Sequence, residues 1–482
     1  MPSNRVLTVR TESHSVREEE LREGVRALAA ELGVEAEFPQ QVEETAAAAA
    51  ASVRLPELDR TDIEFITIDP PGARDLDQAL HIERSGQGYL VHYAIADLGA
   101  FITPGDAVDV EANQRGETLY GAGSKIPLHP KAISEDAGSL LPDVVRPAAL
   151  WSIELDAEGN TVSARVERAL VRSRAQLDYA QVQAQLDAGE AGDVIGLLRE
   201  VGERRVALEA ARGGVSLPLP EQEVVEGEDG SLRLEFRSLL AVEDWNAQIS
   251  LLTGMAAAAM MVTARVGLLR TLPPAAERDV QRLRRTARSL QVDWPRDQSY
   301  PDFIRSLDPT RPNHAAMVVA CTRLLRGSGY VAFDGELPEQ TRHEAIAAEY
   351  AHVTAPLRRL VDRYTTEVCL ALSAGEPVPE WVLERLPGLP DTMRESGRRA
   401  SAYENGILNL VEAALLEDRV GETFAGVILD ADERKPTRGS VSISNPAIEA
   451  VVESEQPLPV GEDVTVRLVV ADPATRKVAF RL

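Results

Sequence analysis

Three aspartates gather in one short stretch of the chain, TIDPPGARDLDQAL, which covers residues 67–80. Asp69 follows the apolar run IEFITI, and Asp75 and Asp77 stand two residues apart after the turn-forming run PPGAR. Carboxylates repel one another, so such a cluster is either a solvated acidic loop or a site for a cation. In extended backbone, residues two apart point to the same side, so these carboxylates could converge on one point.

Oxygen ligands of this kind suit a hard cation. Magnesium is typically held by few carboxylates, several waters and the phosphate oxygens of a substrate. In phosphoryl-transfer sites, two cations about 3.5–4 Å apart activate the attacking water and stabilise the leaving oxygen. The spacing therefore indicates phosphoryl transfer as one interpretation, and the solvated loop stays open as the other.

The elements around the cluster follow from periodicity and turn residues. IEFITID and GYLVHYAIAD are apolar runs bounded by turns, so they predict strands on both sides of the aspartates. Residues 172–418 are mostly helical in period, with RAQLDYAQVQAQLDAG, AVEDWNAQISLLTGMAAAAMM and RRLVDRYTTEVCLALSAG as examples. Residues 420–482 hold short alternating strands, which predict a small five-stranded OB-type barrel.

The N-terminal region predicts two helices, over residues 16–32 and 38–53. Leucines and valines recur at helical spacing in the first, and Pro39 suits the first turn of the second. Two short helices around a turn fit either a helix-turn-helix module or an arm packed on the main body.

Composition limits the partners of the chain. The 482 residues carry a formal net charge of −26, which by itself disfavours a nucleic-acid ligand. Seven arginines nevertheless fall within residues 265–290, so a local basic channel could still hold a polyanion. The apolar stretch 249–269 is rich in alanine and carries Arg265, which predicts a buried helix rather than a membrane span. Cys321 and Cys369 lack metal-ligand spacing and are assigned to the core of a cytoplasmic protein without a leader peptide.

Beyond the aspartates, several motifs in a fixed order resemble the RNB-type exoribonucleases, the ribonuclease II and ribonuclease R family. The family pattern of a strand, Ile-Asp, a turn and Asp-hydrophobic-Asp-Asp-Ala is similar to TIDPPGARDLDQAL. Further matches are VHYAIADLGAFITPGDAVDVEANQRGETLY, KIPLHPKAISEDAGSL, RAQLDYAQV, AVEDWNAQISLL and YAHVTAPLRRLVD. The resemblance covers residues 39–482, and it favours a cation site over a solvated loop.

The resemblance implies an α+β fold. It places a short helical module in residues 1–38, an RNB catalytic domain with a mixed sheet surrounded by helices in 39–419, and an S1-type OB-fold barrel in 420–482. No cold-shock domains are expected before the catalytic domain. The implied activity is processive 3′→5′ hydrolysis of RNA to nucleoside 5′-monophosphates by a two-metal mechanism, with Mg²⁺ or Mn²⁺. The expected partner is single-stranded RNA, or duplex RNA with a 3′ overhang, and the protein is expected to be a monomer without an obligate protein partner or a membrane.

Specific roles carry over position by position. The resemblance implies that Asp69, Asp75 and Asp77 bind metal, and that Asp77 is the residue on which the chemistry depends most. Arg358, in APLRRL, matches an arginine that contacts the scissile phosphate, where a fixed cation would stabilise developing charge. These four residues form the expected catalytic set.

Other matched positions are expected to contact RNA. Tyr179 matches a tyrosine that stacks on the 3′-terminal base, and Tyr120 an aromatic that grips the far end of the bound strand. Glu404 falls where the family has a glutamate near the terminal nucleotide, and Arg359 joins Arg358 in the expected RNA-binding set. His352, which precedes VTAP, is interpreted as a structural histidine.

The main departure from the family pattern is Gln78, where a fourth aspartate is usual. An amide oxygen can still ligate a metal or accept from a metal-bound water, so Gln78 stays in the expected metal set, but it brings no charge. Two further functions therefore remain open: an RNB scaffold that binds RNA with weakened or lost catalysis, and a metal-dependent hydrolase of a small phosphoester. The second of these would need neither a basic channel nor a barrel.

Overall fold

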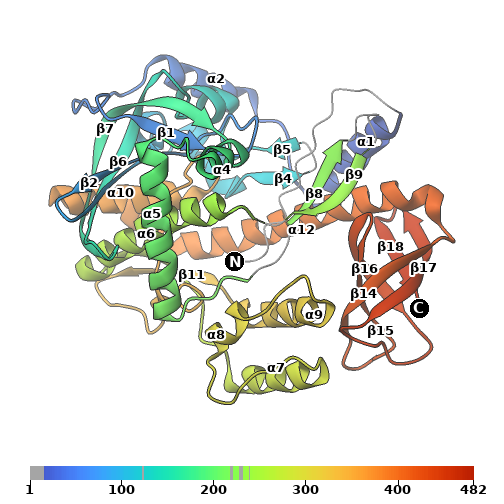
Figure 1. Ribbon diagram of the computed structural model, residues 1–482. Helices are drawn as coiled ribbons and strands as arrows, with labels where there is room; N and C mark the ends of the chain where they lie inside the picture. Colours follow the sequence, from blue (N-terminus) through green and yellow to red (C-terminus); the bar gives the residue numbers. More distant parts are fainter. Residues whose placement is uncertain (1–15, 122–123, 218–220, 227–231, 238) are drawn as a thin grey trace.

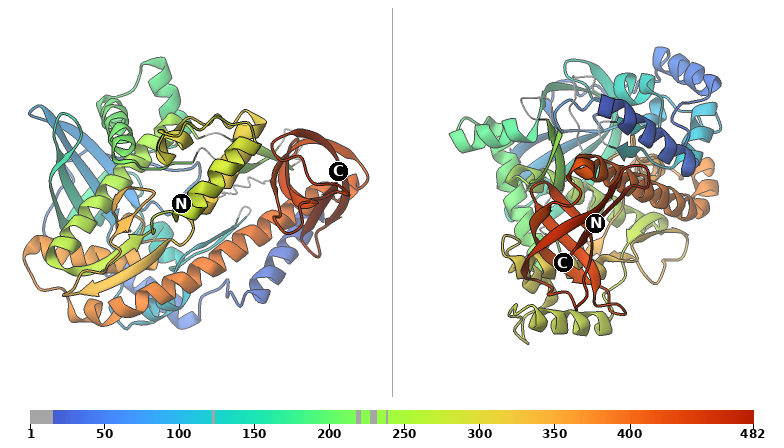
Figure 2. Two further views of the ribbon diagram at one scale, coloured as in Figure 1. Left: turned by 90° about the horizontal axis from the view of Figure 1, so that it is seen from below. Right: turned by 90° about the vertical axis from the view of Figure 1, so that its right-hand side faces the viewer.

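Two closed five-stranded barrels lie at opposite ends of the molecule, and the long helix α12 (Leu389–Leu416) runs between them (Figure 1). The computed structural model describes residues 16–121, 124–217, 221–226, 232–237 and 239–482. Helix α12 contacts elements of the larger part at one end and strands of the smaller barrel at the other. The view from below in Figure 2 shows the same arrangement, in which α12 connects the two barrel-containing parts.

The larger barrel contains the strands that flank the aspartates. Its strands are β1 (Phe65–Ile68), β2 (Gln78–Ser85), β3 (Gly88–Ala96), β6 (Val145–Leu155) and β7 (Thr161–Leu177), joined in the order β1-β2-β3-β6-β7. Strand β1 pairs antiparallel with β2 and parallel with β7, which closes the barrel. The predicted mixed sheet is therefore confirmed.

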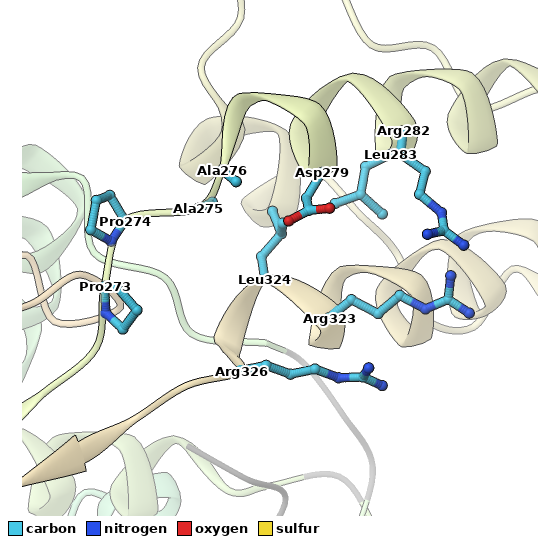
Figure 3. Close-up of a pocket in the computed structure, with 10 residues that line it drawn as sticks. All are labelled: Pro273, Pro274, Ala275, Ala276, Asp279, Arg282, Leu283, Arg323, Leu324 and Arg326. Carbon is cyan, nitrogen blue, oxygen red and sulfur yellow. The ribbon is translucent and has the colours of Figure 1, made fainter.

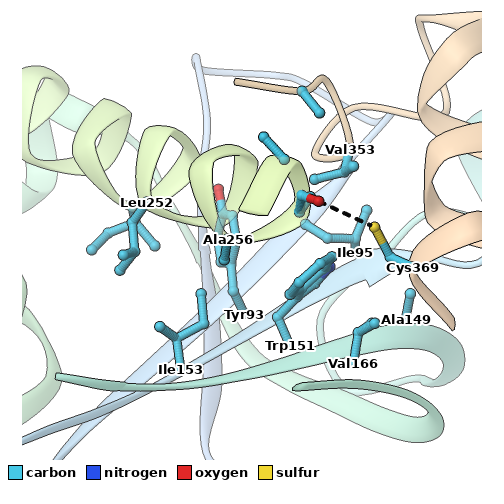
Figure 4. Close-up of a cluster of buried hydrophobic side chains, with 14 of the residues drawn as sticks. Tyr93, Ile95, Ala149, Trp151, Ile153, Val166, Leu252, Ala256, Val353 and Cys369 are labelled. Atoms are coloured by element: carbon cyan, nitrogen blue, oxygen red, sulfur yellow. Dashed lines mark hydrogen bonds between the residues drawn. The ribbon is translucent and has the colours of Figure 1, made fainter. Parts of the chain in front are cut away.

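Large apolar side chains fill the face of this barrel that helices cover. Tyr93 and Trp151, from neighbouring strands, are fully buried and lie against helix α6 (Ala241–Ala264) (Figure 4). Helix α6 is long and apolar enough to cross a membrane by length and composition alone, yet most of its apolar window is buried in the protein, as predicted. Cys369 donates a weak hydrogen bond to the Ala257 carbonyl, and both cysteines of the chain are buried and free.

Further elements surround the two barrels. The helices of the larger part are α2 (Gln40–Ala51), α3 (Ala107–Arg115), α4 (Tyr179–Ala188), α5 (Asp193–Arg212), α10 (Leu360–Ala374) and α11 (Glu380–Arg385). Helices α7 (Glu277–Ser289), α8 (Tyr300–Arg305) and α9 (Pro312–Cys321) form a separate cluster beside the smaller barrel (Figure 1). Two-stranded ribbons are β4–β5 (Leu119–Gly121 and Ser124–Ile126), β8–β9 (Glu221–Glu226 and Leu232–Arg237), β10–β11 (Val266–Thr271 and Gly329–Asp334) and β12–β13 (Arg342–His343 and Ala348–Glu349).

The two predicted N-terminal helices are present as α1 (Val16–Glu31) and α2. Helix α1 packs along α12, where Leu28 is buried, and α2 packs on α3. Pro39 stands at the N-cap of α2. Residues 1–15 of the predicted N-terminal module lie outside the described residues.

The smaller barrel occupies the end of the chain. Its strands are β14 (Thr423–Ala431), β15 (Arg438–Ser444), β16 (Ala447–Glu453), β17 (Asp463–Asp472) and β18 (Lys477–Arg481), in the order β14-β15-β16-β18-β17. Phe424 and Phe480 pack edge to face in its core. The predicted five-stranded barrel is confirmed.

Two boundary predictions were wrong. The helix predicted over residues 249–269 ends at Ala264, because Val266–Thr271 pair with β11 as strand β10. The segment RAQLDYAQVQAQLDAG was predicted to be helical throughout, but its first four residues complete strand β7. Residues 175–177 pair with residues 66–68 of β1, and this tertiary pairing overrides the helical period. The helix starts only after Asp178, whose side chain accepts from the Gln181 N–H in a capping box.

Candidate active site

The aspartate loop joins β1 to β2, and backbone hydrogen bonds fix both of its ends. The Asp69 N–H donates to the Leu177 carbonyl at the end of β7, 3.1 Å away. The Asp77 carbonyl accepts from the Ala96 N–H of β3 at 2.9 Å. The barrel therefore sets where the first and the last aspartate emerge.

The middle of the loop is pinned by one serine. Ser139 donates its hydroxyl proton to the Arg74 carbonyl at 2.6 Å and accepts from the Leu76 N–H at 2.9 Å. Gly72 turns the chain with φ of +79°, a conformation that side-chain-bearing residues rarely adopt. The run PPGAR thus makes the predicted turn, and Ser139 holds the residues on either side of Asp75 in place.

Asp77 connects the loop to the segment that carries Arg358. Its buried carboxylate accepts from the Leu357 N–H at 2.7 Å through Oδ1, and its Oδ2 lies 3.7 Å from Arg358 Nε. Burial raises the pKa of Asp77 well above its usual value, although Arg358 and the Leu357 N–H act in the opposite direction. The structure thus brings together the two residues predicted to matter most for chemistry, which are 281 positions apart.

Asp69 and Asp75 interact with this centre electrostatically. The pKa of Asp69 is raised to about 7, mainly by burial and secondly by the Asp75 carboxylate, while Arg358 acts in the opposite direction. Asp75 also raises the pKa of Asp77. All three predicted aspartates therefore lie within one electrostatic site beside Arg358.

Gln78, the first residue of β2, uses both ends of its amide within the protein. Its Nε2 donates to the Thr354 carbonyl at 2.6 Å, and its Oε1 accepts from the Tyr93 hydroxyl at 2.7 Å. The Tyr93 hydroxyl also lies 2.8 Å from the Ser250 hydroxyl of α6. The amide thus ties the barrel to the segment that ends in Arg358. Metal ligation by Gln78 stays a prediction.

A lysine contacts the acidic loop. Lys125, in β5, places its Nζ 2.7 Å from Asp75 Oδ1 and 3.0 Å from Glu135 Oε1. Burial lowers the pKa of Lys125, but the two carboxylates outweigh it and hold that pKa above the usual value. The ammonium is therefore a fixed positive charge within the aspartate cluster.

A divalent cation fits these residues in a limited way. Since burial raises the pKa values of Asp69 and Asp77, a positive charge placed beside them would stabilise their ionised forms. Across the described part of the chain, however, no group of three or more His, Cys, Asp or Glu side chains is arranged to hold a metal ion. Magnesium commonly binds one or two carboxylates together with water and substrate phosphate. The arrangement suits a cation held jointly with a substrate, and the three-aspartate ligand set stays a prediction.

Tyr179 is the first residue of α4 and stands next to the capping Asp178. Its hydroxyl accepts from Asn246 Nδ2 at 3.4 Å. Burial and the Asp69 carboxylate raise the pKa of Tyr179 to about 12. The ring therefore lies on the Asp69 side of the site, where the 3′-terminal base is expected.

Tyr120 and Glu404 approach the site from another side. Tyr120 lies on β4, directly opposite Lys125 in the β4–β5 ribbon, and is 36% exposed. Burial raises the pKa of its hydroxyl, and both Arg358 and Asp75 influence that pKa, so the ring lies near the aspartates. Burial and the neighbouring Glu117 raise the pKa of Glu404, on α12, to about 7.

Arg359 has different surroundings from Arg358. Its guanidinium is paired with the buried Asp362, at 2.5 Å and 2.8 Å, whereas the Arg358 side chain is 38% exposed. Asp362 also accepts from the Ala355 N–H, so this pair shapes the turn that precedes Arg358. RNA contact by Arg359 stays a prediction. His352 is half-buried and shares a hydrogen bond with the Tyr330 hydroxyl, which is consistent with a structural histidine.

Five of the seven arginines in the basic stretch lie in helix α7, where Arg278 and Arg285 are exposed, and the other two lie at the end of α6 and in β10. A cavity of about 340 Å³ lies between α7 and the turn Thr322–Leu325. The guanidinium groups of Arg282, Arg323 and Arg326 lie on the same side of this cavity (Figure 3). Two of them, Arg282 and Arg323, pair with Glu433 of the smaller barrel, so this cluster joins α7 to that barrel.

Sequence reasoning missed several residues that build the site. Lys125, Glu135 and Ser139 all come from KIPLHPKAISEDAGSL, which had been matched as a motif without roles for its members. Tyr120 and Lys125 stand on either side of the run GAGS in the sequence, and a hairpin interpretation would have paired them. The contact between Asp77 and the Leu357 backbone has no sequence signal.

Fold and site together define a class: a two-barrel protein with a buried aspartate, at the end of one barrel strand, beside an arginine. The model of the RNB domain matches residues 58–372, and that of the RNase II-type exonuclease C-terminal S1 domain matches residues 422–482. Since the first covers more than half of the chain, the chain belongs to the RNB exoribonuclease family. The family resemblance of the motifs is confirmed.

One alignment to a sequence relative is longer than the two family matches together. Ribonuclease R 1 of Lactococcus lactis subsp. lactis is 24% identical over 427 residues, which cover 83% of this chain and 51% of the relative. This chain thus spans about half the length of the curated relatives it matches.

Solved structures show the same fold. Mycoplasma genitalium RNase R in complex with ribose-methylated single-stranded RNA aligns with a TM-score of 0.84 at 18% identity, over 96% of this chain and 78% of that one. The same protein in complex with double-stranded RNA gives 0.82, over 96% and 83%. Yeast Ssd1, described as a pseudonuclease, gives 0.71 at 14% identity, over 90% and 55%.

Proposed function

We propose that this protein is a divalent-metal-dependent 3′→5′ exoribonuclease that releases nucleoside 5′-monophosphates processively. One observation carries the proposal: buried Asp77 accepts from the Leu357 N–H and lies 3.7 Å from Arg358, within the electrostatic field of Asp69 and Asp75. We take this retained arrangement as support for a working site.

The residues divide the work of hydrolysis. Asp69, Asp75 and Asp77 are the expected holders of Mg²⁺ or Mn²⁺, which supplies a Lewis acid and an activated water when bound. Arg358 is partly exposed and is placed to stabilise the charge that develops on the phosphate. The water oxygen bonds to phosphorus, the bond from phosphorus to the 3′ oxygen of the preceding nucleotide breaks, and that oxygen takes up a proton.

The substrate is proposed to be single-stranded RNA held by its 3′ end. Tyr179 provides a ring for the terminal base, and such stacking is favourable by about 1–3 kcal/mol per base. Tyr120 is proposed to hold the far end of the bound strand, and Glu404 is proposed to lie near the terminal nucleotide. Structured RNA with a 3′ overhang is a further proposed substrate, since a protein of the same fold has been solved with double-stranded RNA.

A second candidate is an RNA-binding protein without turnover. Two observations favour it: the neutral Gln78 stands where the family usually has an aspartate, and the chain shares its fold with a described pseudonuclease. Both candidates predict RNA binding, so only cleavage separates them.

A gel time course separates them. RNA labelled at its 5′ end is incubated with Mg²⁺ and either the parent protein or Asp77→Asn, with EDTA and DNA as controls. Conversion of full-length RNA to a very short labelled product, without a ladder and only by the parent with metal, supports the exoribonuclease. Intact RNA that both proteins shift equally in a binding gel would replace this proposal with the second candidate.

A further inference from the structure

The position of Lys125 bears on how many metal ions the site takes. Its ammonium lies between two carboxylates, 2.7 Å from Asp75 and 3.0 Å from Glu135. The three side chains are only 24%, 17% and 15% exposed, so this is not an ordinary surface ion pair. Glu135 belongs to the helical turn Ala132–Ala137, which gives the lysine an anchor outside the aspartate loop.

The β4–β5 ribbon delivers the lysine to this place. Residues directly opposite each other in an antiparallel pair lie on the same face, and Lys125 pairs with Tyr120. The same ribbon face therefore carries an aromatic ring expected to contact RNA and a cation that contacts an expected metal ligand.

Two neighbouring positions of the site, Asp75 and Gln78, bear on whether a second ion can bind. Gln78 brings no negative charge, and its amide is already engaged by Thr354 and Tyr93. Asp75 is engaged by Lys125. A second divalent cation would depend on these two positions, so it would have to displace the ammonium and then bind beside a neutral amide.

We propose that Lys125 is a positioning residue that fills the place of a second divalent cation, so that the site binds one metal ion per chain. Asp69 and Asp77 would hold that ion, while Lys125 pairs with Asp75 and supplies a permanent positive charge. This inference deepens the proposed nuclease function and rests on it for its catalytic meaning. The number of metal ions bound per chain, one instead of two, can be measured without RNA.

The test is the number of Mn²⁺ ions bound per chain, from the loss of free Mn²⁺ signal in electron paramagnetic resonance, without RNA. The parent is expected to bind one ion. Lys125→Met is expected to bind two, because removal of the ammonium leaves Asp75 and Glu135 close together with room for a cation. Lys125→Arg keeps the charge and is expected to stay at one, as is Lys131→Met, an exposed lysine of the neighbouring turn.

Two outcomes would overturn the proposal. Two ions in the parent would mean that a metal displaces Lys125. This measurement uses the parent protein alone, so it does not depend on whether a variant folds. One ion in a folded Lys125→Met would mean that the ammonium does not occupy a cation site. RNA cleavage is scored separately: a parent that binds one ion but leaves RNA intact refutes the nuclease, whereas a parent that degrades RNA with two bound ions refutes only the role of Lys125.

Discussion

Replacing Asp69 by asparagine should stabilise the metal-free protein while it impairs function. In the folded state the pKa of Asp69 is about 7, compared with an ordinary value of 3.8. The main cause is burial of the carboxyl group, and the second is the nearby Asp75 carboxylate. The folded protein therefore resists ionising this carboxyl group, whereas the unfolded chain does not. Asparagine has nearly the same shape and removes the charge.

The sign and size follow from proton linkage. Below about pH 4 both states hold the proton, so Asp69 costs no stability there. Between pH 4 and 7 the unfolded chain loses the proton first, so the penalty grows, and it is complete above pH 7. A difference between 3.8 and about 7 corresponds to about 4 kcal/mol, which is an upper limit because water can relax the buried charge.

The assay is thermal unfolding in EDTA at several pH values. At pH 8, Asp69→Asn should melt above the parent by about 5 °C at most, and the difference should vanish towards pH 4. Asp62→Asn is the matched control, since Asp62 precedes the same strand and its side chain is 77% exposed. A variant that melts at or below the parent at pH 8, or a difference that is independent of pH, would refute the reasoning.

Three further predictions concern RNA. Tyr179→Ala should raise KM for a short single strand about 5- to 150-fold through lost stacking, whereas Tyr179→Phe should stay near the parent; equal values for both would contradict this. Gln78→Leu removes the hydrogen bond to the Thr354 carbonyl, which holds the segment that leads to Arg358. Single-turnover cleavage should therefore slow about 10- to 100-fold with little change in RNA affinity. A loss confined to affinity would argue against a positioning role for Gln78. The double variant Arg278→Gln, Arg285→Gln should release about two fewer counterions on binding RNA. In filter binding, this is a shallower slope of the logarithm of the binding constant against the logarithm of the salt concentration, and an unchanged slope would place RNA away from α7.

Local patterns predicted much of the fold. The runs IEFITI and GYLVHYAIA became β1 and β3 because each is apolar, short and bounded by turn residues. The alternation in residues 420–482 predicted a barrel, since a small alternating sheet removes its open edges by closing. Arg174–Leu177 were predicted wrongly because pairing with β1, more than a hundred residues earlier, decides their conformation.

The site was predictable only where it is built from motif residues. Asp69, Asp75, Asp77 and Arg358 were identified, and the structure brings them together. Their partners were not identified, because backbone and side-chain partners 50 or more residues away leave no periodic trace. Lys125 belongs to this group: nothing in its own segment shows that it meets an aspartate 50 residues earlier.

The central claim, hydrolysis from the 3′ end at the Asp77–Arg358 centre, is tested most directly by identifying the first product. A single-stranded RNA with adenosines throughout and one guanosine at its 3′ end is mixed with the protein and Mg²⁺, and the released nucleotides are resolved by chromatography over time. Release of guanosine 5′-monophosphate before any adenosine 5′-monophosphate, abolished in Asp77→Asn, is the predicted result. Adenosine products first, a 3′ or cyclic phosphate, or equal release by Asp77→Asn would contradict the claim.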